Sequence, residues 1–381
     1  MTVSVRSIET AVPATVIRQD DIRDVFRRQP GVTKLGARLI NAVFDASAIE
    51  SRHTVIAELD ATVSRAAETE RAVFYDRDSD TILSPSTGTR NEVYRQQARG
   101  LFLAAAARAL DAAQGISAAD VTHVVTVSCT GFYAPGPDYE VVRGLGLDPS
   151  TQRYHLGFMG CYGAFPALRA ARSFCLADPA AVVLVVCVEL CTIHLHSSGD
   201  SDTILSSAVF ADGAAAAVVS ARPPASGETV LDLDVFETVL TPGGEADMAW
   251  TIGDAGFEMT LSSYVPRIIE RHIRDALAPL LAADPGLVDL PYAAVDRWAV
   301  HPGGRSILDK VQANLALTDE QLEPSREVLR EYGNMSSATV LFVLQRILHK
   351  SSSDVAERVC AMAFGPGLTV ETALLTRRTA G

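Results

Sequence analysis

The sequence lacks any apolar run that could cross a bilayer. The longest run, AAVVLVVCVEL at residues 180–190, contains Glu189 near its end, whereas a spanning helix needs about 20 apolar residues. The N-terminus also lacks an apolar segment behind a basic one, so no signal peptide is indicated. We therefore expect residues 180–190 to form a buried strand and the protein to be cytoplasmic, with no membrane span.

A cysteine framework for a metal site or for disulfides is missing as well. The cysteines do not show the paired short spacing of a zinc site, and a chain of 381 residues needs no disulfide framework. We expect most of them to be reduced and buried, with no metal bound. The six cysteines are Cys129, Cys161, Cys175, Cys187, Cys191 and Cys360.

Positive charge is also scarce. Lysine and arginine number 33 against 46 aspartates and glutamates, which gives a formal net charge of -13. This balance disfavours a nucleic acid or an anionic membrane as the main partner, because either would favour a basic surface. A small anionic ligand can still be held by a local group of basic residues.

The composition that is present fits a large, well-packed α/β protein. Hydrophobic residues make up 48% and charged residues 21% of the chain, which argues against disorder. Apolar strands alternate with helical repeats, and this alternation predicts sheets covered by helices. The stretch YDRDSDTILSPSTGTRNEVY (75–94) fits neither pattern, and we expect a surface excursion there.

The chain is too long for one ordinary core, so two domains or a duplicated architecture are expected. The Pro- and Gly-containing segment RPPASGET (222–229) is the best linker candidate and divides the chain into residues 1–225 and 226–381. Each half contains a long helix followed by a strand that runs into a glycine-containing turn, THVVTVSCTG (122–131) and DRWAVHPGG (296–304). This recurring order indicates a duplication.

A possible nucleophile lies in HLGFMGCYGAF (155–165), between a predicted strand and a predicted helix. Gly160 allows a tight turn, and a helix that begins near Tyr162 would direct its positive end toward the sulfur of Cys161. Pro166 fits the first helical turn. We expect a thiol in this position to have a lowered pKa, although a packed, unreactive cysteine is the alternative.

Two further residues could join this thiol. His301 lies at the end of the apolar strand in WAVHPGGRSILDKV, where ligands of α/β proteins commonly bind, although a lone histidine is usually structural. Asn334 in YGNMSSATVLFVL either caps the following helix or donates a hydrogen bond to an oxyanion. A thiol, an imidazole and an amide together suit acyl transfer to sulfur followed by carbon–carbon bond formation.

The sequence around these residues resembles that of the type III polyketide synthases, the chalcone-synthase-like branch of the five-layered αβαβα thiolase fold. The similarity extends from about Ile8 to Leu375. Three segments carry it most clearly and two match less tightly. They are WAVHPGGRSILDKV, GNMSSATVLFVL and FGPGLTVETALL, and then SCTGFYAPGPDY and VFADGAAAAVV.

The resemblance implies two duplicated thiolase-like halves, with the nucleophile in residues 1–225 and its partners in 226–381. Cys161 would carry the acyl chain, and His301 and Asn334 would bind the thioester carbonyl of malonyl-CoA while it loses carbon dioxide. Acyl-CoA and malonyl-CoA would be the substrates, with no cofactor, and the protein would be a homodimer.

The resemblance also implies a set of pocket residues. Phe210 would be the gatekeeper between the coenzyme A tunnel and the cavity, and Gly365, Pro366 and Gly367 would shape the cyclisation pocket. The other implied pocket residues are Cys129, His194, Trp250, Met259 and Ser336.

Several residues depart from the plant members of the family. Met259 replaces a second gatekeeper phenylalanine, and Trp250 replaces a glycine. The lysine-rich stretch that meets the coenzyme A phosphates corresponds here to FDASAIESRH, which leaves Arg52 and Arg305 as the expected phosphate ligands, with Arg27 and Arg28 as alternatives. A metal held by His194 and His196 is a remote alternative, because no third ligand is apparent.

The function expected is loading of an acyl-CoA starter on Cys161, repeated condensation with malonyl-CoA, and cyclisation to a product of the alkylpyrone or alkylresorcinol type. A ketoacyl synthase III of fatty-acid synthesis, which condenses once, is the first alternative. A non-catalytic partner with the thiolase fold is the second.

Overall fold

The computed structural model describes residues 1–60, 72–262, 264–350 and 355–381. One mixed sheet runs through the molecule in the order β13-β14-β15-β10-β1-β9-β8-β6-β7, and three two-stranded sheets (β2-β3, β4-β5 and β11-β12) lie outside it. The strands are β1 (Ser4–Ala11), β2 (Thr15–Arg18), β3 (Ser51–Thr54), β4 (Tyr75–Asp76), β5 (Thr81–Ile82), β6 (His123–Ser128), β7 (Gln152–Gly157), β8 (Val182–Leu190), β9 (Asp212–Ser220), β10 (Thr229–Leu240), β11 (Met248–Gly253), β12 (Gly256–Leu261), β13 (Arg297–Val300), β14 (Glu357–Gly365) and β15 (Thr369–Thr379).

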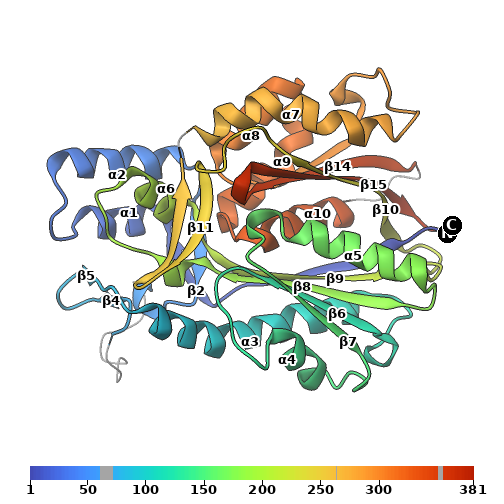
Figure 1. Cartoon of the computed structure of the whole chain (residues 1–381), viewed down its shortest axis with the longest axis horizontal. Helices are drawn as coiled ribbons and strands as arrows, with labels where there is room; N and C mark the ends of the chain where they lie inside the picture. Colours follow the sequence, from blue (N-terminus) through green and yellow to red (C-terminus); the bar gives the residue numbers. More distant parts are fainter. Residues whose placement is uncertain (61–71, 263, 351–354) are drawn as a thin grey trace.

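The helices form three layers around the two halves of this sheet (Figure 1). α5 and α10 lie between the halves, α7 and α8 cover one outer face, and α3 and α4 cover the other. The result is the five-layered αβαβα arrangement that the family resemblance implies. The helices are α1 (Gln19–Arg27), α2 (Lys34–Ala46), α3 (Thr87–Ala112), α4 (Pro137–Gly144), α5 (Ala164–Ala177), α6 (Ser201–Val209), α7 (Val265–Ala282), α8 (Arg305–Leu315), α9 (Asp319–Tyr332) and α10 (Thr339–His349).

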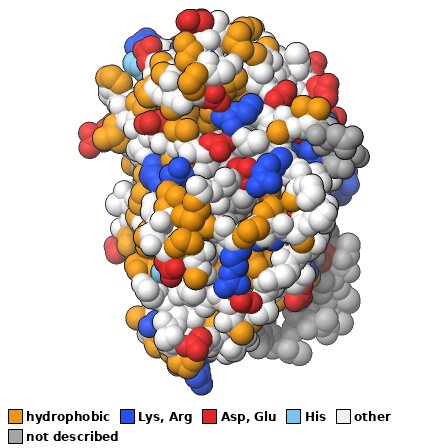
Figure 2. Space-filling model, turned by 90° about the vertical axis from the view of Figure 1, so that its right-hand side faces the viewer, with side chains coloured by type: hydrophobic (Ala, Val, Ile, Leu, Met, Phe, Trp, Pro, Cys, Tyr) orange, Lys and Arg blue, Asp and Glu red, His pale blue; other side chains and the backbone are white. Residues whose placement is uncertain are grey.

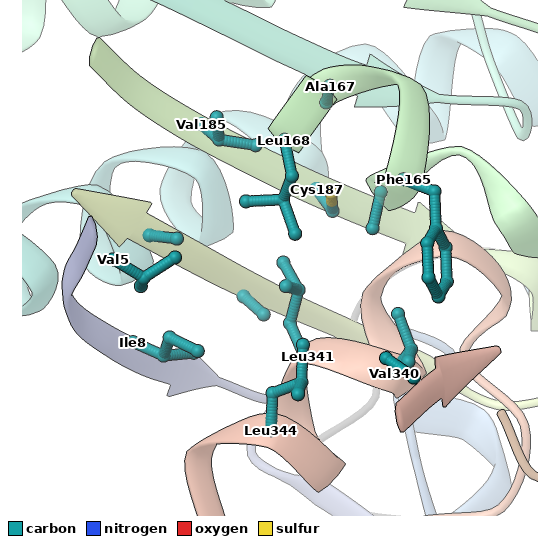
Figure 3. Packing of buried hydrophobic residues seen from close by; sticks show 14 of the residues in the cluster. Val5, Ile8, Phe165, Ala167, Leu168, Val185, Cys187, Val340, Leu341 and Leu344 are labelled. Carbon is teal, nitrogen blue, oxygen red and sulfur yellow. The ribbon is translucent and has the colours of Figure 1, made fainter. Parts of the chain in front are cut away.

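The central layer is packed from both sides, which explains its sequence. Phe165 and Leu168 of α5 meet Leu341 and Leu344 of α10 in one buried cluster, to which strands of both sheet halves contribute (Figure 3). A helix buried on all sides needs no polar face, and α10 accordingly begins with the almost wholly apolar run TVLFVL. β8 is buried along its whole length, so the expectation of a buried strand at residues 180–190 is confirmed.

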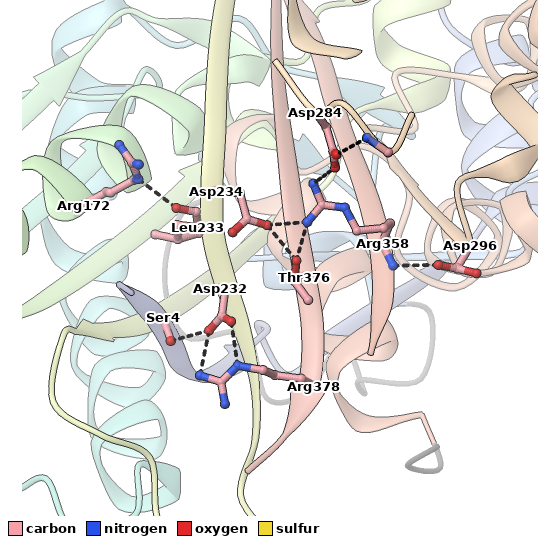
Figure 4. A network of polar contacts seen from close by, with 11 residues as sticks. Ser4, Arg172, Asp232, Leu233, Asp234, Asp284, Asp296, Arg358, Thr376 and Arg378 are labelled. Atoms are coloured by element: carbon pink, nitrogen blue, oxygen red, sulfur yellow. Dashed lines mark hydrogen bonds and ion pairs between the residues drawn. The ribbon is translucent and has the colours of Figure 1, made fainter. Parts of the chain in front are cut away.

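The two halves of the sheet meet where β1 pairs with β10 on one side and with β9 on the other. At this junction Asp232 of β10 accepts hydrogen bonds from Ser4 of β1 (2.6 Å) and from Arg378 of β15 (2.6 Å), as Figure 4 shows. Arg358 of β14 donates to Asp234 at 2.7 Å in the same network. These bonds connect four strands, β1, β10, β14 and β15, at the place where the two halves meet.

Charges of both signs are mixed on the face that carries the chain termini. Figure 2 shows basic, acidic and hydrophobic side chains interspersed there, so this face does not offer the continuous basic surface that a nucleic acid binds. None of the helices in the described ranges is both long and apolar enough to cross a membrane.

The expectation of a surface excursion at residues 75–94 is correct in that residues 75–89 are all half-buried or exposed, but the expectation that this segment contains neither strand nor helix is wrong. β4 and β5 pair with each other, and α3 begins at Thr87, within this segment. Ser86 caps that helix by accepting a hydrogen bond from the Thr89 amide at 3.2 Å. The polar first turn of α3 hid the helix in the sequence, because its buried face includes the unusual residues Arg90 and Tyr94.

Candidate active site

The nucleophile candidate occupies a sharp turn after β7. Phe158 (φ 57°) and Gly160 (φ 71°) both adopt the left-handed conformation, and a Cβ on Gly160 would overlap the ring of Pro366. Glycine is therefore required at position 160, because it tolerates the positive φ and because a side chain would overlap Pro366. Cys161 follows in a short 3-10 helix (η4, Gly160–Tyr162) that leads into α5, so the predicted order of strand, turn and helix is confirmed.

His301 follows β13 directly. Its amide donates to the Met362 carbonyl of β14 at 2.8 Å, which continues the parallel pairing of the two strands by one residue. The side chain is 1% exposed, and neither ring nitrogen has a hydrogen-bond partner among the described residues. Burial lowers the pKa of His301 to about 3, so the imidazole is neutral.

Asn334 lies in the turn between α9 and α10. Its Oδ1 accepts a hydrogen bond from the Ser336 amide at 2.9 Å, two residues further along the chain. The N-cap positions of the 3-10 helix η7 (Ser336–Ala338) and of α10 are Met335 and Ala338, and neither helix start has a side-chain cap, so the expectation that Asn334 caps the following helix is wrong. The Nδ2 group faces the Gly303 carbonyl at 3.4 Å, a distance too long for a strong bond. The amide group therefore retains a donor for another acceptor.

The fold brings these three residues into one cavity of about 910 Å³. They arrive from the loop after β7, the end of β13 and the α9–α10 turn, which lie far apart in the sequence. The other sequence-predicted residues that line the cavity are Cys129, His194, Phe210, Trp250, Met259, Arg305, Ser336 and Pro366. The assigned roles of these residues remain predictions.

The resting thiol differs from the expectation. Burial raises the pKa of Cys161 to about 11, although the neighbouring Ser336 and Asn334 side chains act in the opposite direction. The prediction of a lowered pKa is therefore wrong for this geometry. Desolvation outweighs the effect of the start of α5, because a thiolate in a buried site loses its hydration.

A second thiol lies beside a buried carboxylate that the sequence analysis did not single out. The sulfur of Cys129 is 3.4 Å from Glu189 Oε2 and 3.5 Å from Ser336 Oγ. Glu189 also accepts bonds from the Thr130 hydroxyl (2.9 Å) and the Ser337 hydroxyl (2.5 Å). Burial raises the pKa of Glu189, and an acidic residue near the end of the apolar run 180–190 was the signal that could have revealed it.

The β11–β12 hairpin forms an aromatic wall of the cavity. Trp250 Nε1 donates to the Cys129 carbonyl at 2.7 Å, and His194 Nδ1 accepts from the Phe257 amide at 3.0 Å. The His194 ring stacks on Phe257 with centroids 4.3 Å apart. His194 Nε2 bonds to the Thr130 carbonyl at 2.8 Å, so both nitrogens are engaged within the protein. The described residues contain no cluster of three potential metal ligands.

The loop at residues 365–367 closes the cavity beside Cys161. Pro366 lines the cavity, whereas Gly365 and Gly367 do not. A Cβ on Gly365 would overlap the Tyr162 ring, and Gly367 has a φ of 73°. The two glycines therefore permit the course of the loop, and Pro366 supplies its contact with the cavity.

The expectation that Arg52 binds coenzyme A phosphates is wrong. Its side chain is 0% exposed and donates to the Ser207 and Phe210 carbonyls at 2.8 Å and 2.6 Å. Arg305 does line the cavity, together with Arg267 and Lys310, which the sequence analysis missed. Arg27 and Arg28 are paired with Asp24 and Asp80, respectively.

A buried thiol, imidazole and amide line one cavity of a five-layered α/β fold, a set of groups that suits acyl transfer through sulfur. Comparison with known families makes the assignment specific: the chain belongs to the chalcone and stilbene synthases. The sequence models of the N-terminal and C-terminal domains of that family match residues 2–223 and 232–379. The protein is thus a condensing acyltransferase of the type III polyketide synthase class.

Solved structures of this class superpose over nearly the whole chain. PKS-I from the brown alga Ectocarpus siliculosus has a TM-score of 0.87 at 30% identity, with 99% of this chain and 98% of the alga's chain covered. The type III polyketide synthase domain of Steely1, a type I/III hybrid from Dictyostelium, gives 0.87 at 26% identity, with both chains covered completely (100% and 100%). The bacterial 1,3,6,8-tetrahydroxynaphthalene synthase from Streptomyces coelicolor A3(2) gives 0.83 at 29%, with 99% and 100% covered.

Proposed function

We propose that this type III polyketide synthase loads an acyl group from coenzyme A onto Cys161, extends it with malonyl-CoA and cyclises the product. The observation that carries the proposal is the meeting of Cys161, His301 and Asn334 in one cavity of about 910 Å³. We also propose that the chain consists of two thiolase-like halves, residues 1–225 and 226–381.

In the loading step, the Cys161 sulfur attacks the starter thioester. A bond forms between this sulfur and the acyl carbon, the bond to the coenzyme A sulfur breaks, and the thiol proton ends on coenzyme A. The neutral imidazole of His301 is in the protonation state that can accept this proton in transit. Because the resting thiol is neutral, its proton leaves the sulfur while the sulfur attacks the acyl carbon.

In the extension step, malonyl-CoA loses carbon dioxide and leaves an enolate with its negative charge on the thioester oxygen. Asn334 Nδ2 and a protonated nitrogen of His301 would donate to that oxygen. The enolate carbon then attacks the Cys161 thioester, and the sulfur leaves as thiolate. The lengthened chain, now on coenzyme A, returns to Cys161 for the next cycle. None of these steps calls for a cofactor.

Phosphate binding is proposed for Arg305, together with Arg267 and Lys310, because these cations line the cavity. Arg305 pairs with Asp309 at 3.4 Å and Lys310 pairs with Glu270 at 3.0 Å, both in half-exposed positions. Exposed ion pairs of this kind are weak, so a coenzyme A phosphate can compete with the carboxylates.

The proposed starter is a fatty acyl-CoA, with a product of the alkylpyrone or alkylresorcinol type. The apolar wall around Met248, Trp250, Phe257 and Met259 supports an apolar starter. A panel of acyl-CoA starters with labelled malonyl-CoA, analysed by mass spectrometry, tests the proposal. Several extensions per starter support it, a single extension would indicate a ketoacyl synthase III activity, and no extension would indicate a non-catalytic protein.

The roles of Asn334 and Cys161 can be separated. We expect Asn334→Ala to lower malonyl-CoA decarboxylation about 10² to 10³-fold, as loss of one oxyanion donor does in other enzymes, and to lower starter loading much less. Carbon dioxide release and the mass of the acylated protein measure the two steps, with Cys161→Ala as the variant that cannot be loaded. Equal losses in both steps would contradict the role of Asn334.

A further inference from the structure

The C-terminal end of α6 is bound by a buried cation, the guanidinium of Arg52. The last carbonyls of this helix are all engaged: Arg52 Nη1 binds those of Ser207 (2.8 Å) and Phe210 (2.6 Å), and Gln19 Nε2 binds that of Ala208 at 2.7 Å. The Val209 carbonyl accepts from the Asn334 amide at 2.8 Å. A positive charge at a helix C-terminus is favoured by the helix dipole, but at this place it is also wholly removed from water.

Arg52 is unusual because it is not compensated by a contacting acid. The side chain is 0% exposed, and its Nε and Nη2 groups have no partner among the described residues. Burial lowers the pKa of Arg52 to about 10, which still leaves it charged at neutral pH, and Asp212 acts on it only at longer range. A buried cation of this kind is costly, so its position calls for an explanation beyond packing.

The segments that Arg52 contacts are those that carry the gate and the amide of the site. Phe210 pairs with Asn334 in an isolated parallel bridge, in which the Ala211 amide donates to the Asn334 carbonyl at 2.8 Å. Gly333, which precedes Asn334, has a φ of 70°, and a Cβ there would lie 3.0 Å from Cγ and Cδ of Arg52. The arginine stem therefore packs against one strand of this bridge while its guanidinium holds the other.

We propose that Arg52 is a positioning residue that sets the placement of the Asn334 amide and of the Phe210 gate through this bridge. It touches neither substrate nor the reacting atoms. Without it, the Phe210 carbonyl loses its donor and the space beside Gly333 opens, so the bridge can shift and take Asn334 with it. A displacement of about 1 Å at a reacting group can cost about 10²-fold in rate. The inference rests on the proposed function of Asn334.

The test compares Arg52→Met with Gln19→Met as a matched control. Each variant removes a hydrogen-bond donor to the carbonyls at the C-terminal end of α6. Gln19 binds the Ala208 carbonyl and has no bond to Phe210. The readout is the ratio of malonyl-CoA decarboxylation without a starter to acylation of Cys161 by a starter. We expect Arg52→Met to lower this ratio about tenfold or more, Arg52→Lys to restore part of it, and Gln19→Met to leave it unchanged.

Thermal unfolding of each variant shows whether it is folded. If Arg52→Met does not fold, Arg52→Lys is the variant that tests the inference. A single ammonium group cannot reproduce both carbonyl bonds with the geometry of a guanidinium. We therefore expect its ratio of decarboxylation to acylation to lie between those of the wild type and Asn334→Ala. A wild-type ratio in the folded Arg52 variants, or an equal fall in Gln19→Met, overturns the inference. Failure of the wild-type protein to decarboxylate malonyl-CoA would instead contradict the proposed function.

Discussion

At the scale of single residues, the environment of the nucleophile matters more than its position in the motif. The turn that presents Cys161 follows from Gly160 and the start of α5. The protonation of its thiol follows from desolvation, which raises the pKa to about 11. His301 is neutral for the same reason. A neutral thiol and a neutral imidazole in the resting state lead to a prediction about reactivity.

Alkylation of Cys161 by iodoacetamide should become faster by about tenfold for each pH unit between pH 6 and 9, without a plateau, because the thiolate fraction rises in this way below the pKa. A resting ion pair would give a plateau from about pH 6 upward. The rate of loss of condensing activity measures the reaction. The variant Cys129→Ser combined with Cys191→Ser is the control, because it removes the two other thiols that line the cavity and leaves Cys161 there.

At the scale of elements, the β11–β12 hairpin determines the shape of the cavity wall. It is a separate two-stranded sheet that is fixed to the body through Trp250, which binds the end of β6, and through His194, which binds Phe257. Side chains on this hairpin can therefore change the cavity without disturbing the large sheet.

Trp250→Ala should enlarge the cavity and shift the products toward longer starters or additional extensions. Trp250→Phe loses the bond to the Cys129 carbonyl but keeps most of the bulk, so its product distribution should stay closer to the wild type. We expect a change of about tenfold in the ratio of long to short products for the alanine variant, equivalent to about 1.4 kcal/mol. Mass spectrometry of the products measures this ratio, and an unchanged distribution in both variants would show that Trp250 does not limit the cavity.

At the scale of the whole molecule, the large sheet ends in a strand with a free side. β7 is the last strand in the sheet, and its first three residues are exposed. Tyr154 on this strand and the nearby Phe132 are 40% and 36% exposed. An exposed sheet edge with apolar neighbours is a site for strand pairing. We propose that the homodimer implied by the family resemblance forms with a second copy at β7.

Tyr154→Asp combined with Phe132→Asp should shift the protein from dimer to monomer, because two buried charges of the same sign would face each other across a twofold interface. Sedimentation velocity measures the change. Tyr264→Asp is the control, since Tyr264 is 59% exposed and directly precedes α7, outside β7. A wild-type protein that sediments as a monomer would contradict the proposal.

Stability toward acid is also a property of the whole molecule. The pKa of the buried His194 is lowered to about 3, whereas an unfolded histidine has a pKa of about 6.5. The unfolded state therefore binds a proton first as the pH falls, and this histidine reduces the free energy of unfolding by about 1.4 kcal/mol per pH unit between pH 6.5 and 3.

The His194→Gln variant should accordingly lose about 2 kcal/mol less stability than the wild type between pH 7.5 and 5. Urea unfolding at the two pH values measures the difference. His349→Gln serves as the control, because the His349 side chain is 53% exposed. An equal acid sensitivity of wild type and His194→Gln would show that the ring is protonated in the folded protein.

Local patterns in the sequence predicted sheets covered by helices and indicated the three candidate residues, whereas the five-layered arrangement was implied by the family resemblance. Alternating apolar strands and helical repeats specify sheets covered by helices, and the strand ends at Cys161 and His301 identify chemistry-bearing positions. These signals involve residues that are close together in the chain, so the sequence alone shows them. The start of α3 was missed, because its buried face carries Arg90 and Tyr94 in place of aliphatic residues.

Only the tertiary structure decided how these residues are charged and what holds them. Arg52, one residue after Ser51 on a short strand, looks like a surface cation in the sequence, yet it lies wholly inside the protein under the Phe210–Asn334 bridge. Glu189 and Cys129 likewise become neighbours only when β6 and β8 pair. Desolvation and charge proximity depend on every segment that packs around a group, and no local stretch of sequence contains that information.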